Sequence, residues 1–347
     1  MNDSSNTSAT ESQPQLSYEA IPQLVPIAVI ILLTNGVVFL LFYKRKGLRT
    51  PPNYLLLSLA ISDIMTGLIN IPLFLSELIL NQTSVLIPAL RGTSAVFHNV
   101  ISFSIAYHIT AITAEKYLAV VNPFGRNMMT TKTAAKVALA VWLWSTLLGT
   151  IPACWFEDWL AWEGIALYLQ AGYNIICLVI VFLFPFLFIL YAYCIMFRAV
   201  SSKAGLTKSL QRKNSQAFKK AANERKAMII LLSMAIAFAV CWMPWFTLML
   251  TYSLINIEWL PEERASPLEP AAHIFVIVRY VSSAINPLLY TFFKQDFWNA
   301  FRVVVLKKPP RRPSLSMRVV SQRTRGSEQI DKLLLEKNIG KSSGTSL

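Results

Sequence analysis

The run IICLVIVFLFPFLFILYAYCIMF (Ile175–Phe197) decides the fold class of this 347-residue chain. It carries no charge and is longer than the roughly 20 residues that a helix needs to cross the hydrocarbon core of a bilayer. Six further stretches have the same apolar character: Ile21–Tyr43, Tyr54–Ser76, Ser94–Ala114, Ala134–Phe156, Ala227–Ile255 and Ala271–Phe293. With 54% hydrophobic and 14% charged residues, the chain is too apolar for a water-soluble domain. The sequence therefore predicts an all-α membrane protein, a bundle of seven transmembrane helices.

The segments outside the apolar stretches complete the domain organisation. Residues 1–20 are polar and lack the basic start and apolar middle of a secretory signal peptide. They are predicted to form an N-terminal segment, which the distribution of basic residues places outside the cell. The seven-helix domain covers residues 21–293. Phe293, Phe297 and Phe301 then recur every four residues, which predicts a short amphipathic surface helix over 294–306. Residues 307–347 are predicted to be a disordered cytoplasmic tail.

The distribution of basic residues predicts the orientation in the membrane. Cytoplasmic loops collect Lys and Arg, and 29 of the 32 basic residues lie in alternate loops, adjoining span ends and the tail. The segments on the other side contain Arg91 and Arg264 against eleven acidic residues, so their net charge is −9. We therefore expect a multi-pass plasma-membrane protein with an extracellular N-terminus and a cytoplasmic C-terminus.

Two further expectations follow from this orientation. Because the topology explains the net charge of +14, the expected partner of the basic surface is anionic membrane lipid rather than nucleic acid. Three Asn-X-Ser/Thr triplets on the predicted extracellular side are candidate glycosylation sites, at Asn2, Asn6 and Asn81.

Polar residues inside the spans are candidate functional residues, because a charge at mid-bilayer costs about 2.5–3.5 kcal/mol on insertion scales. Asp63 in span two is interpreted either as a polar contact between helices or as a cation or proton site. Polar residues of span seven recur at spacings of three and four, which places most of them on one face: Arg279, Tyr280, Ser283, Asn286 and Tyr290. Prolines bend three spans, at Pro185, Pro244 and Pro287. Bent helices favour a bundle that flexes.

Several short motifs in the right order and spans identify a family. They are LAISD (Leu59–Asp63), EKYLAVVNP (Glu115–Pro123), FAVCWMP (Phe238–Pro244) and NPLLY (Asn286–Tyr290), together with Asn35, Trp142, Pro152, Pro185 and Tyr193. From about Ile21 to Phe301 the chain resembles a rhodopsin-like (class A) G-protein-coupled receptor. The resemblance implies that an extracellular ligand rearranges the helices and that heterotrimeric G proteins and arrestin bind on the cytoplasmic side.

The resemblance assigns the cytoplasmic switch to Glu115-Lys116-Tyr117. These residues lie at the family's acid-Arg-Tyr position, where the basic residue helps hold the receptor inactive and later contacts the G protein. Here the base is lysine, which keeps the charge but lacks the planar fork of arginine. Glu224, about five and a half turns before Pro244, is expected to pair with Lys116 as a latch between spans three and six. The other implied switch residues are Tyr193, Pro244, Pro287 and Tyr290.

If the family geometry holds, the ligand binds in the extracellular half of the bundle. The candidate ligand-binding residues are His98, Asn99, Ser102, Tyr173, Asn174, Trp242, His273, Val276, Arg279 and Tyr280. Arg279 and His98 favour a small acidic or polar ligand, because a buried guanidinium attracts an oxyanion. The alternative for Arg279 is an internal salt bridge or contacts with carbonyls. His98 stands where amine receptors of the family have aspartate, and Tyr280 where opsins have the retinal-binding lysine, so neither ligand class is expected.

Three smaller features complete the resemblance. A weak sodium site is implied beside Asp63, with Asn35, Ser282, Ser283 and Asn286; no other metal or cofactor is expected. Arg91 replaces the family's span-three cysteine, so the usual disulfide is missing and none is expected among Cys154, Cys177, Cys194 and Cys241. The C-terminal residues Thr345, Ser346 and Leu347 match the pattern that strand-adding PDZ domains bind.

Two other classes of function remain open. A receptor-like protein with little G-protein activation is an alternative because of Lys116. A channel or transporter is a second alternative, although the spans show no two-half repeat of broken helices. The motifs of zinc, phosphate-binding and serine-nucleophile enzymes are not present in the sequence, so no catalytic activity is expected.

Overall fold

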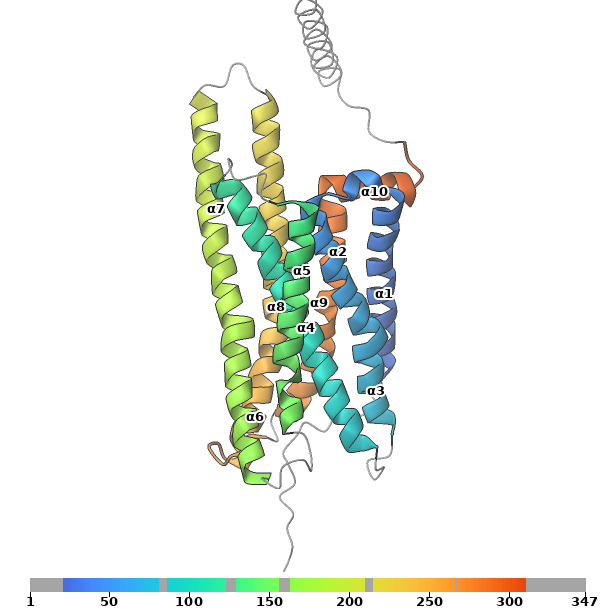
Figure 1. Cartoon of the computed structure of the whole chain (residues 1–347), viewed down its shortest axis with the longest axis vertical. Coiled ribbons are helices and arrows are strands. Elements are labelled where there is room, and N and C mark those ends of the chain that lie inside the picture. The colour runs from blue at the N-terminus through green and yellow to red at the C-terminus, as the bar shows by residue number, and fades with distance from the viewer. Residues whose placement is uncertain are drawn as a thin grey trace, which may run out of the picture. The chain divides into compact units, whose positions relative to one another are not determined.

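The computed structural model describes residues 21–80, 86–122, 129–155, 163–209, 215–265 and 268–309, and no strand occurs among them. For 163–164, 202–209, 215–224 and 227 it describes the backbone alone. Within these ranges seven helical segments are long and apolar enough to cross a membrane, which confirms the predicted fold class. In chain order, spans one to seven are α1 (Ile21–Lys44), α2–η3–α3 (Pro51–Met65, Thr66–Asn70, Ile71–Ile79), α4 (Ile87–Val121), α5–η5 (Thr131–Thr150, Ile151–Cys154), α6–η6–α7 (Glu163–Cys177, Leu178–Leu183, Phe184–Ser209), α8 (Ser215–Asn256) and α9 (Glu269–Phe293) (Figure 1).

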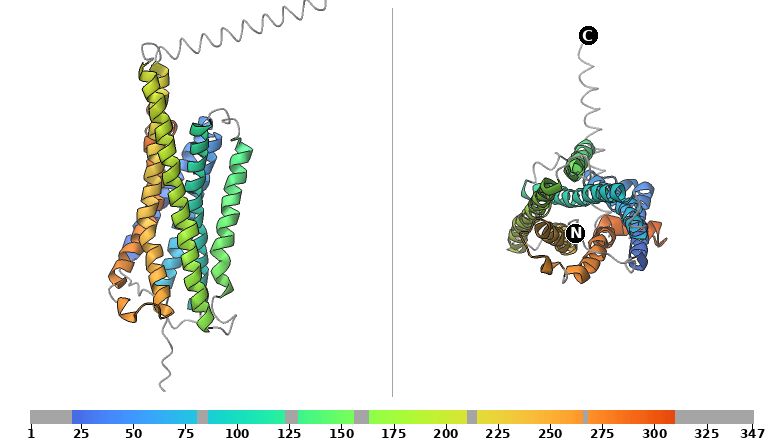
Figure 2. Two further views of the ribbon diagram at one scale, coloured as in Figure 1. Left: turned by 90° about the vertical axis from the view of Figure 1, so that its left-hand side faces the viewer. Right: turned by 90° about the horizontal axis from the view of Figure 1, so that it is seen from below.

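The helices run past the apolar stretches that predict them. Span three covers Ile87–Val121 rather than Ser94–Ala114, and span five covers Ile165–Ser201 rather than Ile175–Phe197. Hydropathy marks only the part of a helix that lies in hydrocarbon, whereas the backbone hydrogen bonds continue beyond it. α7 and α8 extend beyond the other helices at the end of the bundle that carries α10 (Gln295–Val304) (Figures 1 and 2). We call this end the α10 end and the opposite end the distal end.

Spans two and five each contain a π-helical segment that ends two residues before a proline. η3 precedes Pro72, and η6 precedes Pro185. Proline has no N–H, so the carbonyl four residues earlier loses its helical partner, and a single wide turn absorbs this loss. The N–H of Ile71 accordingly bonds to the carbonyl of Thr66, five residues back. The wide turn rotates the residues that follow it relative to those before it.

A network of hydrogen bonds joins spans two, three and four. His108 Nδ1 lies 2.8 Å from the carbonyl oxygen of Ser104, so this nitrogen donates and Nε2 accepts from Ser58 Oγ at 2.8 Å. Trp142 Nε1 donates to the same hydroxyl at 3.1 Å. The hydroxyls of Ser104 and Ser62 lie 2.8 Å apart. Buried polar groups whose partners are all present favour one packing arrangement, so this network holds the three spans together.

Small residues let span four lie against span three. The buried residues of α5 are Ala134, Ser145 and Gly149. A Cβ atom at Gly149 would lie 2.7 Å from the backbone nitrogen of Val100 and 2.9 Å from its Cα. Small side chains that allow close backbone approach are a common means of helix packing in lipid, where no hydrophobic effect drives helices together. Gly149 therefore sets the separation of spans three and four.

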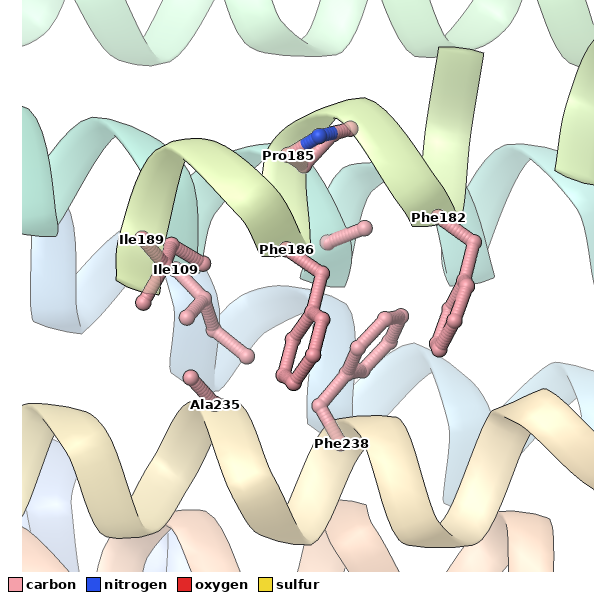
Figure 3. Close-up of a pocket in the computed structure, with 8 residues that line it drawn as sticks. Ile109, Phe182, Pro185, Phe186, Ile189, Ala235 and Phe238 are labelled. Carbon is pink, nitrogen blue, oxygen red and sulfur yellow. The ribbon is translucent and has the colours of Figure 1, made fainter. Parts of the chain in front are cut away.

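Spans three, five and six meet around Pro185 with a small apolar cavity between them. Figure 3 shows the side chains of Phe186 and Phe238 between the ribbons of spans five and six. Ala106 of span three and Ala235 of span six also line the cavity. Atoms that border a void lack partners on one side and lose dispersion contacts, so packing restrains Pro185 less than it would in a filled core.

Helix α10 follows span seven after a break at Lys294, where ψ is 118°. Phe297 is fully buried, and its ring lies 5.3 Å from that of Tyr290, centroid to centroid. The observed helix lies within the predicted range 294–306. The described residues up to Phe301 belong to one compact unit, which contains the seven spans.

Candidate functional site

An aromatic cage surrounds Arg279 in the distal half of span seven. The residue is only 3% exposed. Its Cζ atom lies 3.8 Å from the ring centroid of Trp245, 4.7 Å from that of Tyr280 and 5.3 Å from that of Phe74. A desolvated cation over an aromatic face gains about 2 kcal/mol or more. Spans two, six and seven thus hold a positive charge inside the bundle.

Arg279 makes fewer hydrogen bonds than a buried guanidinium can. Nη2 donates to the hydroxyl of Tyr280 at 2.8 Å, and Nη1 lies 3.4 Å from Nε2 of His98. Nε has no hydrogen-bond partner among the described residues. Within the described ranges, Lys116 and Lys294 form ion pairs with Glu115 and Asp296. The Glu77 carboxylate lies within electrostatic range of Arg279, so the internal salt bridge that is the alternative interpretation of Arg279 stays a prediction.

The contacts of His98 fix the position of its proton. A guanidinium only donates, so Nε2 of His98 accepts from Arg279 and Nδ1 carries the proton. Nδ1 lies 3.3 Å from Nδ2 of Asn70, and Oδ1 of the same amide has no partner in the described structure. If the amide is turned so that Oδ1 of Asn70 faces His98, Oδ1 accepts a hydrogen bond from Nδ1. The two orientations of an amide have nearly the same shape, so this turn leaves the packing unchanged. A neutral His98 therefore links Arg279 to span two.

Helical spacing explains how these side chains reach one another. Asn70, Phe74 and Glu77 are separated by four and three residues, so they share one face of span two beyond the wide turn. Glu77 lies close to Ser94 and within electrostatic range of Arg279. Towards the distal end, the face of span two that meets Arg279 therefore presents an amide (Asn70), an aromatic ring (Phe74) and a carboxylate (Glu77).

The tryptophans of span six lie on the other side of His98. The imidazole centroid lies 5.4 Å from that of Trp242 and 6.1 Å from that of Trp245. The sequence interpretation omits Trp245, which lies three residues after Trp242 and could be found by that spacing. It also omits Asn70, whose signal is an amide within an apolar span. No sequence signal marks Phe74.

Two of the predicted ligand-binding residues have hydroxyls that other groups use. Ser102 is 2% exposed and donates to the carbonyl of His98 on its own helix. The hydroxyl of Tyr173 donates to the carbonyl of Leu148 at 3.1 Å, so it faces span four. Asn99 and His273 are half-buried, and Val276 is buried. The ligand-binding roles of Ser102, Tyr173, Asn99, His273 and Val276 stay predictions, since no described contact joins their side chains to the Arg279 cage.

Asn174 belongs to a chain of hydrogen bonds at the distal ends of spans four, five and six. Trp155 Nε1 donates to Gln170 Oε1 at 2.9 Å, and Gln170 Nε2 donates to Asn174 Oδ1 at 3.2 Å. Asn174 Nδ2 donates to Ser253 Oγ at 2.7 Å. The amide of Asn174 is therefore already satisfied, and a ligand would have to replace one of these partners.

A polar core lies next to the cage, towards the α10 end. Trp242 Nε1 donates to Ser282 Oγ at 3.0 Å, and this hydroxyl donates to the carbonyl of Arg279 at 3.0 Å. Asn286 Nδ2 donates to Asp63 Oδ2 at 3.3 Å. Asn35 Nδ2 donates to the carbonyl of Ser283 at 3.1 Å. The structure therefore connects the predicted sodium-site residues with the residues around Arg279.

This core contains buried oxygens that lack a described hydrogen-bond partner. They are Oδ1 of Asp63, Oδ1 of Asn35, Oδ1 of Asn286 and Oγ of Ser283. Asp63, Asn35 and Asn286 are each 0% exposed. Carboxylate and amide oxygens are the ligands that hard cations prefer, so these residues fit a small cation.

The α10 end contains a small cavity between spans two, three, six and seven. Glu115 and Lys116 of span three line it, with Tyr290 and Lys294 at the end of span seven, and its apolar walls are formed by Pro52, Leu56, Ile112, Ile230, Leu231 and Met234. Lys116 Nζ lies 3.5 Å from Glu115 Oε2. Tyr117 and Tyr193 pack beside this region against a buried cluster of spans five and six. The structure thus brings Lys116 and Tyr290 to one cavity.

Lys294 is a residue of this cavity that the sequence interpretation missed. Its Nζ donates to Oδ1 of Asn53 and lies 3.6 Å from Oδ2 of Asp296. Asn53 Nδ2 also donates to Asp296 Oδ2 at 3.1 Å. Burial lowers the pKa of Lys294, the charge of Asp296 raises it, and the charge of Lys116 lowers it. A lysine just after an apolar span is common, so the sequence offers no signal for this contact.

Several predicted positions lie outside the described residues. They are the glycosylation candidates Asn2, Asn6 and Asn81, the PDZ-type end Thr345-Ser346-Leu347 and the tail from 310 onward. The side chain of Glu224 also falls outside, so its pairing with Lys116 stays a prediction. The four cysteines are free thiols; Cys177 and Cys241 are buried, and Cys154 and Cys194 are exposed.

Comparison with known proteins places the seven spans in a family. A family model described as 7 transmembrane receptor (rhodopsin family) matches residues 34–290. The match covers more than half of the chain, so the chain belongs to the rhodopsin family of seven-transmembrane, G-protein-coupled receptors. It is therefore a receptor with an extracellular ligand and a G-protein partner, and not an enzyme.

The curated relatives are receptors at low identity. The chain is 26% identical to neuromedin-U receptor 2 of Homo sapiens, over 81% of this chain and 70% of that receptor. It is 27% identical to somatostatin receptor type 5 of Bos taurus, over 78% of this chain and 72% of the receptor. It is also 27% identical to a QRFP-like peptide receptor of Branchiostoma floridae, over 90% and 86% of the two chains.

Proposed function

We propose that this receptor is activated by an extracellular peptide that brings an anionic group to Arg279, and that it passes the signal to a heterotrimeric G protein at the α10 end. The observation that carries this proposal is the guanidinium with an unpartnered Nε at 3% exposure. A buried cation is costly unless it is paired and hydrogen-bonded, and Glu77 acts on Arg279 only at electrostatic range. An anionic ligand group would supply that partner.

The relatives favour a peptide over the small acidic or polar molecule that the sequence favours. Their names refer to neuromedin U, somatostatin and a QRFP-like peptide. The two ideas share an anionic group for Arg279 and differ in the size of the ligand. Family membership does not favour the channel or transporter alternative.

The path from ligand to G protein follows the described contacts. An anion at Arg279 competes with His98 and the aromatic cage for the guanidinium. His98 contacts Trp242, and Trp242 is hydrogen-bonded to Ser282 in span seven. A change at the cage thus reaches spans six and seven, which meet at the cavity of Lys116 and Tyr290.

The orientation and the remaining partners are also proposals. The basic loops support an extracellular N-terminus and a cytoplasmic α10 end. The same basic surface supports contact with anionic lipid. Arrestin follows from the family, and a PDZ protein from the C-terminal triplet.

Arg279→Gln is expected to lose most of the response to the ligand. A library of synthetic secreted peptides, read by G-protein dissociation in cells, would first identify an agonist. Removing one partner of a buried charge pair costs about 2–5 kcal/mol, or roughly 30-fold or more in agonist potency. Arg264→Gln, which removes an exposed cation of η7 (Glu262–Arg264) at the distal end, is the control and should respond like the wild type.

The anchor role of Arg279 would be wrong if the variant reached the cell surface and answered the same peptide at unchanged concentration. A collapse of surface expression would instead show that Arg279 has a structural role. Arg279→Lys keeps the charge without the planar fork and is expected to respond at intermediate concentration.

We also propose that Asp63 and its neighbours bind sodium weakly. Sodium that binds only the folded receptor stabilises it by about 1.4 kcal/mol at roughly tenfold excess over Kd. The Tm of purified wild-type receptor should therefore rise in sodium relative to choline at equal ionic strength. Asp63→Asn removes the charge and should show no such difference. An equal shift in both proteins would contradict the site.

A further inference from the structure

Charges of opposite sign lie at different depths along the proposed ligand site. Arg279 is the deep charge, 97% buried by the aromatic cage and with Nε unpartnered in the described structure. Glu77 lies two turns of span two beyond Asn70 towards the distal end, within electrostatic range of Arg279. The site therefore changes from positive in the interior to negative nearer the distal surface.

The distal rim continues this negative character. Glu258, Glu262 and Glu263 follow span six, and Glu269 begins span seven, and all four are exposed. We call these four residues the acidic rim. Arg91 and Arg264 are the basic residues at the same end within the described ranges. Surface acids attract a basic ligand during approach, and they repel one whose charge is negative throughout.

The stacking of Arg279 limits the shape of the anionic group. The guanidinium carbon is 3.8 Å from the ring centroid of Trp245, so this ring covers one face. On the edge formed by Nε and Nη2, Nε lacks a hydrogen bond and Nη2 uses one of its two hydrogens for Tyr280. A planar carboxylate accepts two parallel hydrogen bonds from such an edge.

From this charge order we infer that the ligand is a peptide with a carboxylate at its inserted end and basic residues behind it. The inference rests on the proposed function and adds the chemical class and direction of the ligand. The carboxylate would bond to Arg279, while lysine or arginine side chains would face Glu77 and the acidic rim. The carboxylate comes either from the C-terminus or from an Asp or Glu side chain near the inserted end.

The experiment uses two matched libraries of synthetic peptides, one with free C-terminal acids and one with C-terminal amides. Each library contains basic, neutral and acidic members, and Asp or Glu is present or absent near each terminus. Full-length receptor is compared with Arg279→Gln and with a triple rim variant, Glu258→Lys, Glu262→Lys and Glu263→Lys. Surface expression is matched, and G-protein dissociation is the readout.

We expect basic free-acid peptides to be the most potent agonists of the wild type, with amidation lowering potency by about tenfold or more. If an Asp or Glu side chain supplies the carboxylate that binds Arg279, amidated peptides with Asp or Glu near the inserted end keep their potency. Amidated peptides without such a residue lose it. In Arg279→Gln, peptides with and without the carboxylate should become equally potent. The rim variant should weaken basic peptides while keeping the preference for a carboxylate.

Two outcomes separate this inference from the proposed function. If peptides activate the wild type and neither kind of carboxylate changes their potency, the inference is overturned and the peptide-receptor function stands. The same conclusion follows if Arg279→Gln preserves the preference for a carboxylate, or if rim reversal leaves basic peptides unaffected. If no peptide of either library activates the receptor, both the inference and the proposed peptide function are overturned.

Discussion

A Lys116→Ala receptor is expected to lose agonist-driven G-protein dissociation while reaching the cell surface normally. Lys116 lines the cavity at the α10 end, and its side chain is 27% exposed. Its ion pair within the described residues is with Glu115, its neighbour on the same helix. A partner that enters the cavity therefore meets an ammonium whose ion pair, among the side chains that the structure describes, lies within its own span.

The alanine variant removes this charge and leaves Glu115, whose side chain is 10% exposed, without its cation. The loss of the ammonium and the unpaired carboxylate of Glu115 both weaken binding of a partner's carbonyl or carboxylate groups in the cavity. Lys116→Met keeps most of the side-chain volume and should fail equally, because the missing quantity is charge. Lys116→Arg should couple severalfold better than wild type, since a planar fork makes more directed hydrogen bonds.

Agonist dose-response curves at matched surface expression, in one cell line, measure these effects. A Lys116→Ala receptor that signals as well as the wild type would refute the assigned role of the Glu115-Lys116-Tyr117 switch. Equally weak responses of both receptors would favour the alternative of a receptor-like protein with little G-protein activation.

Gly149→Leu is expected to abolish folding of the receptor to the cell surface. Even a Cβ atom at this position would lie 2.7 Å from the backbone nitrogen of Val100, and a backbone atom of a packed helix cannot turn aside as a side chain can. Overpacking costs about 1–3 kcal/mol in ordinary cores and more where the backbone must shift. Spans three and four would have to separate.

The graded form of this prediction is Gly149→Ala, which should lower the Tm of the purified receptor. Gly36→Ala is the matched control, because a Cβ atom at Gly36 meets nothing within 4 Å. Alanine favours a helix over glycine by about 1 kcal/mol, so the control should be neutral or slightly stabilising. Equal Tm values for Gly149→Ala and the wild type would show that spans three and four are not packed as described.

The fold class could be predicted from the sequence because lipid imposes a length on every apolar run. Ile175–Phe197 alone predicts a span, and the motifs EKYLAVVNP and NPLLY give the family. The helix ends could not be predicted, since hydrogen bonding carries span three to Ile87 and Val121 beyond its apolar core. Hydropathy predicts the length of the helix segment inside the bilayer core, but not how far the helix continues outside it.

The centre of the candidate site was predictable, but its surroundings were less so. Arg279 and His98 stand out because charged and ionisable groups are rare in spans. Phe74 and Asn70 reach Arg279 across span two after the wide turn at Thr66–Asn70. Where such a turn forms, and what it faces, depends on packing against other helices. Similarly, Lys294 gains meaning only when Asn53, far away in the sequence, lies beside it.

The hydrogen-bond network of His108 has a mechanical consequence for the whole receptor. With Gly149 in contact with Val100, it makes spans two, three and four a stator, a block that keeps its shape while other parts move. Spans five and six, with Pro185 beside a cavity and Pro244 within α8, are the rotor. We expect ligand-driven displacement to be concentrated in the rotor, so that the stator gives the moving helices a fixed frame of reference.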